Sequence, residues 1–341
     1  MEKTEKKSPF LTVVIPCYNV ALYLKDCLDS LFENDTSMCQ VICVDDGSTD
    51  ATAEILKEYK KSHPIEIITQ KNKGLSGARN SGMKKALGTY IYFFDSDDVI
   101  KNNFMETVIP LLQKEKPDIL QFNFKGFFDR DFGKESDGNG RGLTFSGLTI
   151  ENGQSSFTGK ELFCKMAKNE KFIFSVWTKI FKKDFLVKNN ISFIEGIYYE
   201  DVHYLFETFM KAKKVFLCPE VLYSYRVREN SIMTKKITEK NFYSYFATME
   251  VIFNLLKTEK LSAEEEFAVE TFFATIQNAF YDKSKHSSAL DLNSMLQTSS
   301  ERIFYNAFVK SSCLLRKENE EKFGKRFIVK AWRKVKKLLG K

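Results

Sequence analysis

Three carboxylates follow directly after a strongly apolar run of the chain. The segment TYIYFFDSDDVI passes from aromatic and aliphatic side chains into Asp95, Asp97 and Asp98. Clustered carboxylates repel one another unless a cation joins them, and their oxygens are the ligands that Mg²⁺ or Mn²⁺ prefers, usually together with substrate phosphates. The pattern therefore indicates a site for a divalent metal and a phosphate. The other interpretation is a solvated turn whose acids cap a helix.

Two earlier apolar runs also lead into polar side chains. The run LTVVIP ends at Pro16 and is followed by Tyr18 and Asn19, and QVICV leads into Asp45 and Asp46. In an open parallel sheet, ligands bind outside the carboxyl ends of the strands. We therefore expect the polar groups after these runs to meet at one edge of a sheet.

The elements that must position these side chains alternate regularly along the first hundred residues. Strand-like runs are separated by helical patterns of apolar residues, and a stripe of Ala78, Gly82 and Ala86 predicts a helix that packs closely. The expected strands lie at 11–16, 40–45, 65–69 and 90–94. This alternation predicts the α/β class, with a mostly parallel sheet covered by helices on both faces.

The remainder of the chain has a different character. Seven of the 16 glycines fall within residues 126–153, which predicts a loop or an irregular hairpin. From about residue 235 the pattern is helical, with a polar break at KHSSALDLNS. We expect a first unit over 1–235 and a helical C-terminal region over 236–341.

Four short motifs carry a resemblance to a known family. VVIPCYN, VDDGSTD, KGLSGARNSG and FDSDD, in this order and spacing, resemble the family-two inverting glycosyltransferases, in particular those of bacterial surface-polysaccharide or lipooligosaccharide synthesis. The likeness covers residues 10–100 closely and extends more loosely to about 235. Four ordered motifs are a specific signal. The resemblance implies a GT-A-like nucleotide-binding sheet and makes 1–235 the nucleotide-sugar-binding and catalytic domain.

For the donor nucleotide, the resemblance implies a role for each polar group after the first two strands. Pro16 and Tyr18 would line the pocket for base and ribose, with Asn19 among the donor-binding residues. Asp46 would accept a hydrogen bond from a uracil ring, and Asp45 would support the turn. A UDP-sugar is thus the implied donor, although Tyr18 is also a reasonable packing aromatic and Asp45 a simple capping residue.

For the phosphates and the metal, the resemblance points to the third and fourth motifs. Asp97 would hold Mn²⁺ or Mg²⁺, Asp95 the sugar or ribose and also the metal, and Asp98 would lie close by as a further metal residue. Arg79 would face the ribose or the diphosphate, where its fixed fork of N–H donors suits a phosphate. The alternative for Arg79 is an exposed position on a helix.

The acceptor side is predicted from GIYYEDVHYLFE. Glu200 and Asp201 open an apolar helical pattern and resemble the acidic pair of the family. By that likeness Asp201 is the general base for the acceptor hydroxyl, and Glu200 orients it or binds the acceptor. The alternative is that both acids only complement the dipole at a helix N-terminus.

Four further residues are weaker candidates for the acceptor or a phosphate. Trp177 is either a platform for the acceptor sugar or a core residue, and Lys179 is expected near phosphate. Arg226 and Arg228 alternate onto one face of a strand and either clamp the diphosphate or an acidic acceptor, or are solvated. His203 lies near the acidic pair, but a lone His is more often structural, so we assign it no metal.

The end of the chain is strongly basic. Residues 322–341 hold nine Lys and Arg and no acid, so the remainder has a net charge of −2, which argues against a general nucleic-acid-binding surface. Apolar residues recur there at helical spacing, as in a helix that lies on anionic lipid. The alternative is a helix that packs on its own domain or on a subunit partner.

The cysteine count and the shortness of the apolar runs predict where the protein is located in the cell. The odd count of seven Cys, the polar start MEKTEKKSPF and the lack of an apolar run near ~18 residues predict reduced thiols, no signal peptide and no membrane span. We expect a cytoplasmic protein, peripheral on the inner face of the cytoplasmic membrane.

Together these features predict a metal-dependent, hexosyltransferase-like enzyme. It would move a sugar from a nucleoside-diphosphate donor to a hydroxyl of a glycan or lipid-linked acceptor. The alternative is a catalytically silent nucleotide-sugar-binding subunit of a membrane-associated assembly complex. A nucleotidyltransferase fits less well, because PCYNVALYLKD lacks the glycine- and lysine-rich loop expected after the first strand.

Overall fold

The fold was examined in a computed structural model of the chain. It describes residues 8–129, 153–169, 171–228, 239–256 and 259–284. Residues 1–7, most of the glycine-rich segment 126–153, the break at 285–294 and the basic segment 322–341 lie outside these ranges, so their predictions stay predictions.

A four-stranded parallel unit forms the nucleotide-binding half of the sheet. Its order is β3-β2-β1-β4, and the helices α1, α2 and α3 connect its strands. The bounds are β1 (Leu11–Cys17), α1 (Leu24–Phe32), β2 (Cys39–Asp45), α2 (Thr52–Ser62), β3 (Ile65–Thr69), α3 (Gly74–Lys85) and β4 (Tyr90–Phe93). The four expected strands and the α/β class are confirmed.

The other half of the sheet mixes strand directions. The sheet continues from β4 through β8, β6, β9 and β5, with β7 also on β9; only the β6–β9 pair in this half is parallel. The bounds are β5 (Val99–Ile100), β6 (Ile119–Phe128), β7 (Ser156–Phe157), β8 (Lys179–Lys182) and β9 (Val215–Val227). The sequence had not predicted these antiparallel additions.

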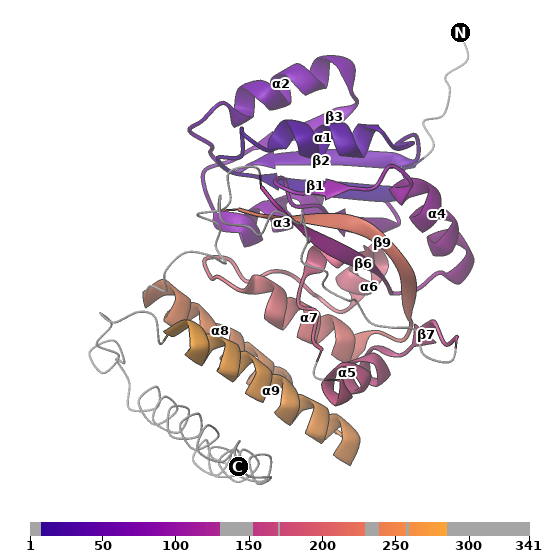
Figure 1. Cartoon of the computed structure of the whole chain (residues 1–341), viewed down its shortest axis with the longest axis vertical. Coiled ribbons are helices and arrows are strands. Elements are labelled where there is room, and N and C mark those ends of the chain that lie inside the picture. Colours follow the sequence, from indigo (N-terminus) through magenta and orange to yellow (C-terminus); the bar gives the residue numbers. More distant parts are fainter. Residues whose placement is uncertain (1–7, 130–152, 170, 229–238, 257–258, 285–341) are drawn as a thin grey trace.

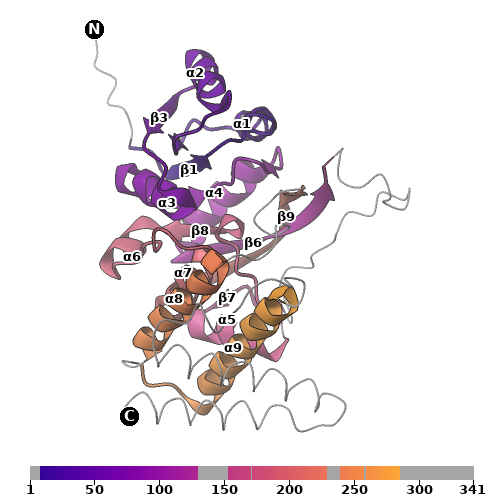
Figure 2. The same cartoon turned by 90° about the vertical axis from the view of Figure 1, so that its left-hand side faces the viewer.

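Helices cover both faces of the sheet, as expected (Figures 1 and 2). One apolar core joins the sheet to α1, α2 and α4 (Phe104–Glu115). A second core, on the other face, joins it to α3 and to the later helices. These are α5 (Gly159–Lys168), α6 (Lys183–Lys188), α7 (Glu200–Lys211), α8 (Glu239–Leu256) and α9 (Ala263–Ser284).

The predicted small-residue stripe sets how closely α3 lies on the sheet. A Cβ atom at Gly82 would be 2.2 Å from Cγ1 of Val14 on β1, a distance that real Cβ contacts do not reach. Ala78 is buried on the same face. Because the helix is this close to β1, it carries Arg79 down to the carboxyl edge of the sheet.

The helical C-terminal region is confirmed as far as it is described. Tyr245 and Met249 of α8 and Phe272 of α9 belong to the same core as Phe206 of α7. No helix within the described ranges has the length and apolarity needed to span a bilayer.

Candidate active site

The carboxyl ends of β1, β2 and β4 lie side by side at one edge of the sheet. Cys17 pairs with Asp45 at the end of β1 and β2, and Val14 pairs with Phe93 of β4. Asp46 follows β2 directly, and Asp95 lies two residues beyond Phe93. The polar groups that the sequence placed after three strands therefore do meet at one edge.

A single guanidinium joins the acids of the donor motif to those of the predicted acceptor side. Arg79, only 1% exposed, has Nη2 2.8 Å from Oδ1 of Asp95. Its Nη1 lies 2.9 Å from Oε1 of Glu200 and 2.7 Å from Oδ1 of Asp201. Asp201 keeps 16% of its side chain exposed. Arg79 thereby holds Glu200 and Asp201, which lie 121 and 122 positions later in the chain.

This geometry differs from both expectations for Arg79. Arg79 is not exposed on its helix, and its guanidinium has no solvent-facing side that a ribose or a diphosphate could contact. A buried cation is stable only when it is paired and hydrogen-bonded. Arg79 is therefore the counter-ion of three carboxylates in this structure.

Burial dominates the electrostatics of this cluster. It raises the pKa of Asp95 to about 6, because the opposing effect of the Arg79 charge is only partial. Burial, followed by the charge of Asp201, raises the pKa of Glu200 as well. Burial alone would lower the pKa of Arg79, but Asp201, Asp95 and Glu200 together raise it. Arg79 is thus a permanent cation, whereas burial raises the pKa of Asp95 above its ordinary range.

Arg226 of β9 and Arg228, just after the strand, lie at the second part of the FDSDD motif. Arg228 forms an ion pair with Asp97, with Nη2 2.8 Å from Oδ2. Arg226 is buried; its Nε donates to the Asp97 carbonyl at 2.8 Å and its Nη2 lies 2.9 Å from Asp26. Both guanidiniums also lie over the ring of Tyr23, at 5.1 and 5.0 Å. The solvated interpretation is therefore wrong for Arg226.

Asp98 is enclosed and does not offer free oxygens. Its Oδ2 accepts from the Tyr223 hydroxyl at 2.5 Å and its Oδ1 from the Arg226 backbone N–H at 2.6 Å. Burial and then the charge of Asp97 raise the pKa of its carboxyl well above the usual range. Asp98 thus ties the motif to β9, which differs from the expectation that it is a metal residue.

The donor-side residues hold the loops after β1 and β2 together. Asn19, with a positive φ of 51°, accepts the Thr49 N–H at 2.8 Å, and Asp45 accepts the Ser48 N–H at 3.0 Å. Tyr18 is 49% exposed and open for stacking. Pro16 is part of β1, opposite Val44.

Asp46 has partners that the sequence analysis did not identify. Its Oδ1 accepts from Gln70 Nε2 at 2.7 Å and from the Lys73 N–H at 2.9 Å. Gln70 directly follows β3, so the rule that applied to the other strand ends would also have found it.

Trp177 and Lys179 are interior residues. Trp177 is 8% exposed and stacks on Tyr223 at 4.4 Å and on Tyr225 at 5.5 Å between ring centroids. This favours the core interpretation over an acceptor platform. Lys179 is 0% exposed, so the expected contact with a phosphate does not fit its position.

Helix α7 starts from a strained residue. Tyr199, its N-cap, has φ 60° and ψ 32°, a left-handed conformation that is uncommon for a bulky side chain. Its hydroxyl accepts from Asn241 Nδ2 of α8 at 2.8 Å. His203, one turn later, is buried, and burial lowers its pKa to about 4. The helix begins directly after this left-handed residue, so Glu200 and Asp201 lie in its first turn.

The donor set suits a divalent cation bound jointly with a substrate phosphate. Asp97 and Asp95 keep partly exposed carboxylates, at 25% and 20% of their side chains. Within the described ranges, no three His, Cys, Asp or Glu side chains are arranged to hold a metal. Mg²⁺ is typically held by one or two carboxylates plus phosphates. The residues therefore fit a metal that arrives with the nucleotide.

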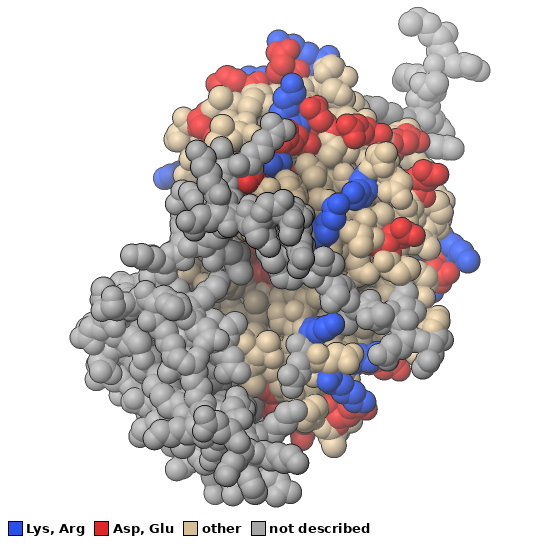
Figure 3. All heavy atoms as spheres, viewed as in Figure 1, with Lys and Arg blue, Asp and Glu red and all other residues tan. Residues whose placement is uncertain are grey.

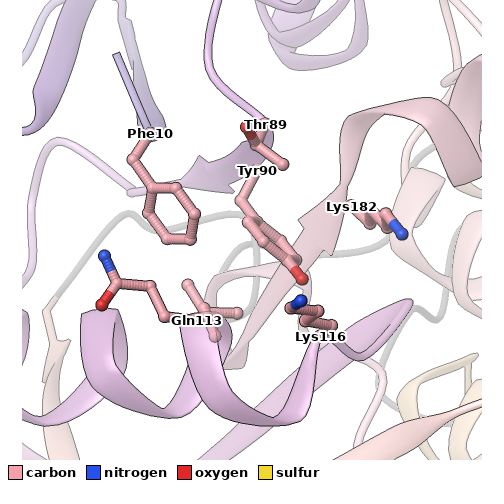
Figure 4. Close-up of a pocket in the computed structure, with 7 residues that line it drawn as sticks. Phe10, Thr89, Tyr90, Gln113, Lys116 and Lys182 are labelled. Atoms are coloured by element: carbon pink, nitrogen blue, oxygen red, sulfur yellow. The ribbon is translucent and has the colours of Figure 1, made fainter. Parts of the chain in front are cut away.

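Two other surface features are separate from this edge. The pocket in Figure 4 is lined by Phe10, Thr89, Tyr90, Leu112, Gln113, Lys116 and Lys182. It lies where β1 and β4 begin, at the opposite edge of the sheet. On the face seen in Figure 1, both acidic and basic side chains lie on the surface of the described residues (Figure 3).

A parallel sheet with carboxylates clustered at its carboxyl edge has the place where open α/β sheets bind their ligands. The chain belongs to glycosyl transferase family 2, whose family model matches residues 12–185. The resemblance based on the four motifs is thus confirmed.

Two relatives agree with this assignment, and a solved structure agrees with the fold. The chain is 30% identical over 264 residues to the glycosyltransferase GlyA of Streptococcus pneumoniae, covering 76% of this chain and 36% of that protein. It is 29% identical over 283 residues to a poly(ribitol-phosphate) beta-glucosyltransferase of Bacillus spizizenii, covering 81% and 40%. The S. aureus TarS 1–349 structure in complex with UDP-GlcNAc is similar with a TM-score of 0.68, at 21% identity, covering 96% and 88%. The TarS likeness confirms the GT-A-like fold. The chain spans less than half the length of GlyA and of the beta-glucosyltransferase.

Proposed function

We propose that the chain is an inverting, metal-dependent glycosyltransferase. It moves a sugar from a nucleoside diphosphate, with UDP as the expected nucleotide, to a hydroxyl of a glycan or lipid-linked acceptor in cell-surface polysaccharide synthesis. The supporting observation is that one buried guanidinium holds Asp95 of the donor motif together with Glu200 and Asp201. The poly(ribitol-phosphate) beta-glucosyltransferase among the relatives supports a polymer as the acceptor.

In this proposal each side chain has a separate task. Asp201 removes the acceptor proton while the acceptor oxygen attacks from the face opposite the leaving diphosphate, so a single displacement inverts the anomeric centre. An ordinary Asp is too weak to ionise a free alcohol in advance, so positioning matters more than basicity. Arg79 and Glu200 hold Asp201 in place.

Donor binding is assigned to the ends of β1, β2 and β4. Tyr18 stacks on the base, Asp46 accepts from it, and Asn19 and Asp45 shape the loops. Asp97, with Asp95, would hold Mn²⁺ or Mg²⁺, which when bound supplies positive charge opposite the diphosphate. Arg228, paired with Asp97 in this structure, would then exchange this carboxylate for a phosphate oxygen.

The test of this assignment is nucleotide binding by calorimetry. The unaltered chain should bind UDP at least about tenfold more tightly in Mn²⁺ than in EDTA, equivalent to about 1.4 kcal/mol. Asp97→Ala should bind UDP with the same affinity in both. The control is Asp184→Ala, which removes an exposed carboxylate near the opposite edge and should retain the Mn²⁺ effect. Equal affinity of the unaltered chain in both buffers would contradict the metal, and no binding of UDP would contradict the donor.

We also propose that residues 322–341 bind anionic lipid as a peripheral anchor, because their charge is wholly positive. The full chain should co-sediment with vesicles that contain phosphatidylglycerol and not with pure phosphatidylcholine. A chain that ends at residue 321 should stay in the supernatant and still bind UDP. As a control, Lys→Gln at four positions of the segment should weaken sedimentation without shortening the chain. Sedimentation of the shortened chain would refute this anchor.

A further inference from the structure

The candidate base is held from two sides. Arg79 contacts Oδ1 of Asp201, and the backbone N–H of Val176 donates to Oδ2 at 3.1 Å. Each carboxylate oxygen thus has one fixed partner, which restricts rotation of the carboxylate plane. The sequence analysis gave the second partner, Val176, no role of its own, although its neighbours Trp177 and Lys179 were candidates for the acceptor or a phosphate.

The segment before Val176 has no regular structure of its own. Residues 171–175 are neither helix nor strand, and Val176–Thr178 form a single 3₁₀ turn before β8. Such a turn has few internal hydrogen bonds. Something else must keep the Val176 N–H aimed at Asp201.

Lys179 supplies that support from inside the protein. Its Nζ donates to the carbonyl oxygens of Ile173 and Ser175, each at 3.1 Å, and to Oγ1 of Thr178 at 2.9 Å. An ammonium has three N–H donors, and all three are used. The bonds reach the chain on both sides of Val176, so the ammonium fastens this segment to the start of β8.

Core stability does not explain a lysine at this position. The side chain is fully buried, and within the described ranges no carboxylate lies close enough to form an ion pair with it. Burial of an ammonium is unfavourable, as the lowered pKa of Lys179, about 7, reflects. An apolar side chain would fill this space at a lower cost in free energy. What the lysine adds is its contacts with the Ile173 and Ser175 carbonyls.

We propose that Lys179 and the Val176 N–H form a brace that fixes the Asp201 carboxylate in the orientation needed to accept the proton of the acceptor hydroxyl. The inference rests on the proposed function, in which Asp201 is the base. Lys179 and Val176 are positioning residues, since neither touches the substrate. The brace matters for turnover and not for donor binding, because the hydrogen bonds of Lys179 and of the Val176 N–H go to Ile173, Ser175, Thr178 and Asp201 and to none of the donor-side residues after β1, β2 and β4.

The sharpest test removes one N–H and little else. Ser175 has φ −122° and ψ 117°, an extended conformation that suits a residue before proline, and Val176 is the first residue of a helical turn, where proline is tolerated. Val176→Pro therefore deletes the donor to Asp201 with little backbone conflict. Val176→Ala is the matched variant, which shortens the same buried side chain but keeps the N–H.

The expected result is a loss in kcat with donor binding retained. Relative to Val176→Ala, Val176→Pro should lower kcat of transfer roughly tenfold to a hundredfold, as expected for a misplaced catalytic group, with the KM for the donor and the affinity for UDP unchanged. Lys179→Met should show the same split, whereas Lys182→Met, on the same strand at the opposite edge, should resemble the unaltered chain. If Lys179→Met does not fold, the comparison of Val176→Pro with Val176→Ala still tests the brace.

Two outcomes would overturn the brace. One is equal kcat in Val176→Pro and Val176→Ala, and the other is a parallel loss of UDP binding, which would indicate general disruption. Failure of the underlying function would look different. In that case Asp201→Asn would itself keep full turnover, whatever the two Val176 variants do.

Discussion

Asp201→Asn should abolish sugar transfer while leaving UDP binding unchanged. The substitution keeps the size of the side chain, and its amide oxygen can still accept one of the two hydrogen bonds that come from Arg79 and Val176. An amide cannot take up a proton, however. General base catalysis contributes about 10²–10⁴ in rate, so kcat should fall by at least about a hundredfold.

The measurement is UDP release from a sugar nucleotide in the presence of acceptor. The donor is chosen first by thermal shift of the unaltered chain across a panel of nucleotide sugars. Asp184→Asn is the control for loss of one carboxylate, since it is exposed on α6. Full turnover by Asp201→Asn would remove the base assignment. If the unaltered chain binds donors but never releases UDP, the catalytically silent subunit becomes the better account.

Removing Arg79 should cause the largest loss of stability of any single substitution at the site. Arg79→Met deletes the cation that pairs with Asp95, Glu200 and Asp201, and buried carboxylates then remain without a counter-ion. Breaking a buried ion pair from one side costs about 3–5 kcal/mol. We expect a decrease of this size in the free energy of unfolding at pH 8, measured by urea denaturation. Lysine should not restore it, because it lacks the fork that reaches three carboxylates.

The loss should depend on pH in a defined direction. In the unaltered chain the pKa values of Asp95, about 6, and of Glu200 lie above their ordinary values. The folded state therefore holds protons that the unfolded state has released, and these groups make the free energy of unfolding fall as pH rises from about 4 to about 6 or higher. Without Arg79 both pKa values rise further, so the fall continues to higher pH. The difference between the two chains should thus be smallest near pH 5 and largest above pH 7.

Arg228→Met is the matched control at the same edge. Arg228 is partly exposed and pairs with a partly exposed Asp97, so screening by water keeps its contribution near ~1 kcal/mol or less. A similar decrease in both variants, or a deficit of Arg79→Met that does not change with pH, would show that the three-carboxylate cluster does not carry the effect.

Local pattern was sufficient for the nucleotide-binding half of the fold. The apolar runs that became β1 to β4, the polar residues after them and the small-residue stripe on α3 each lie within a short window, and their chemistry is the same in any context. Since parallel strands place their carboxyl ends at one edge, the location of Asp46 and Asp95 at the same edge followed from the parallel arrangement of their strands. The four motifs led to the correct family for the same reason.

The positions of the charged side chains could not be obtained in this way. Arg79, Lys179 and Arg226 occur in segments that look like ordinary surface elements, yet all three are buried. Whether a cation can be buried depends on its partners, and here these come from 121 or 200 residues away or from backbone carbonyls of an irregular segment. Trp177 is a similar case, because its stacking on Tyr223 requires β9 to lie beside it.

The chain thus encodes its family, its parallel strands and its set of candidate donor residues in short stretches that can be interpreted one at a time. The antiparallel insertion of β8 between β4 and β6, the gathering of three acids around Arg79 and the support of Asp201 by Val176 exist only in the folded protein. They depend on pairing between distant segments, and no periodicity or residue spacing along the chain specifies which distant partners will meet.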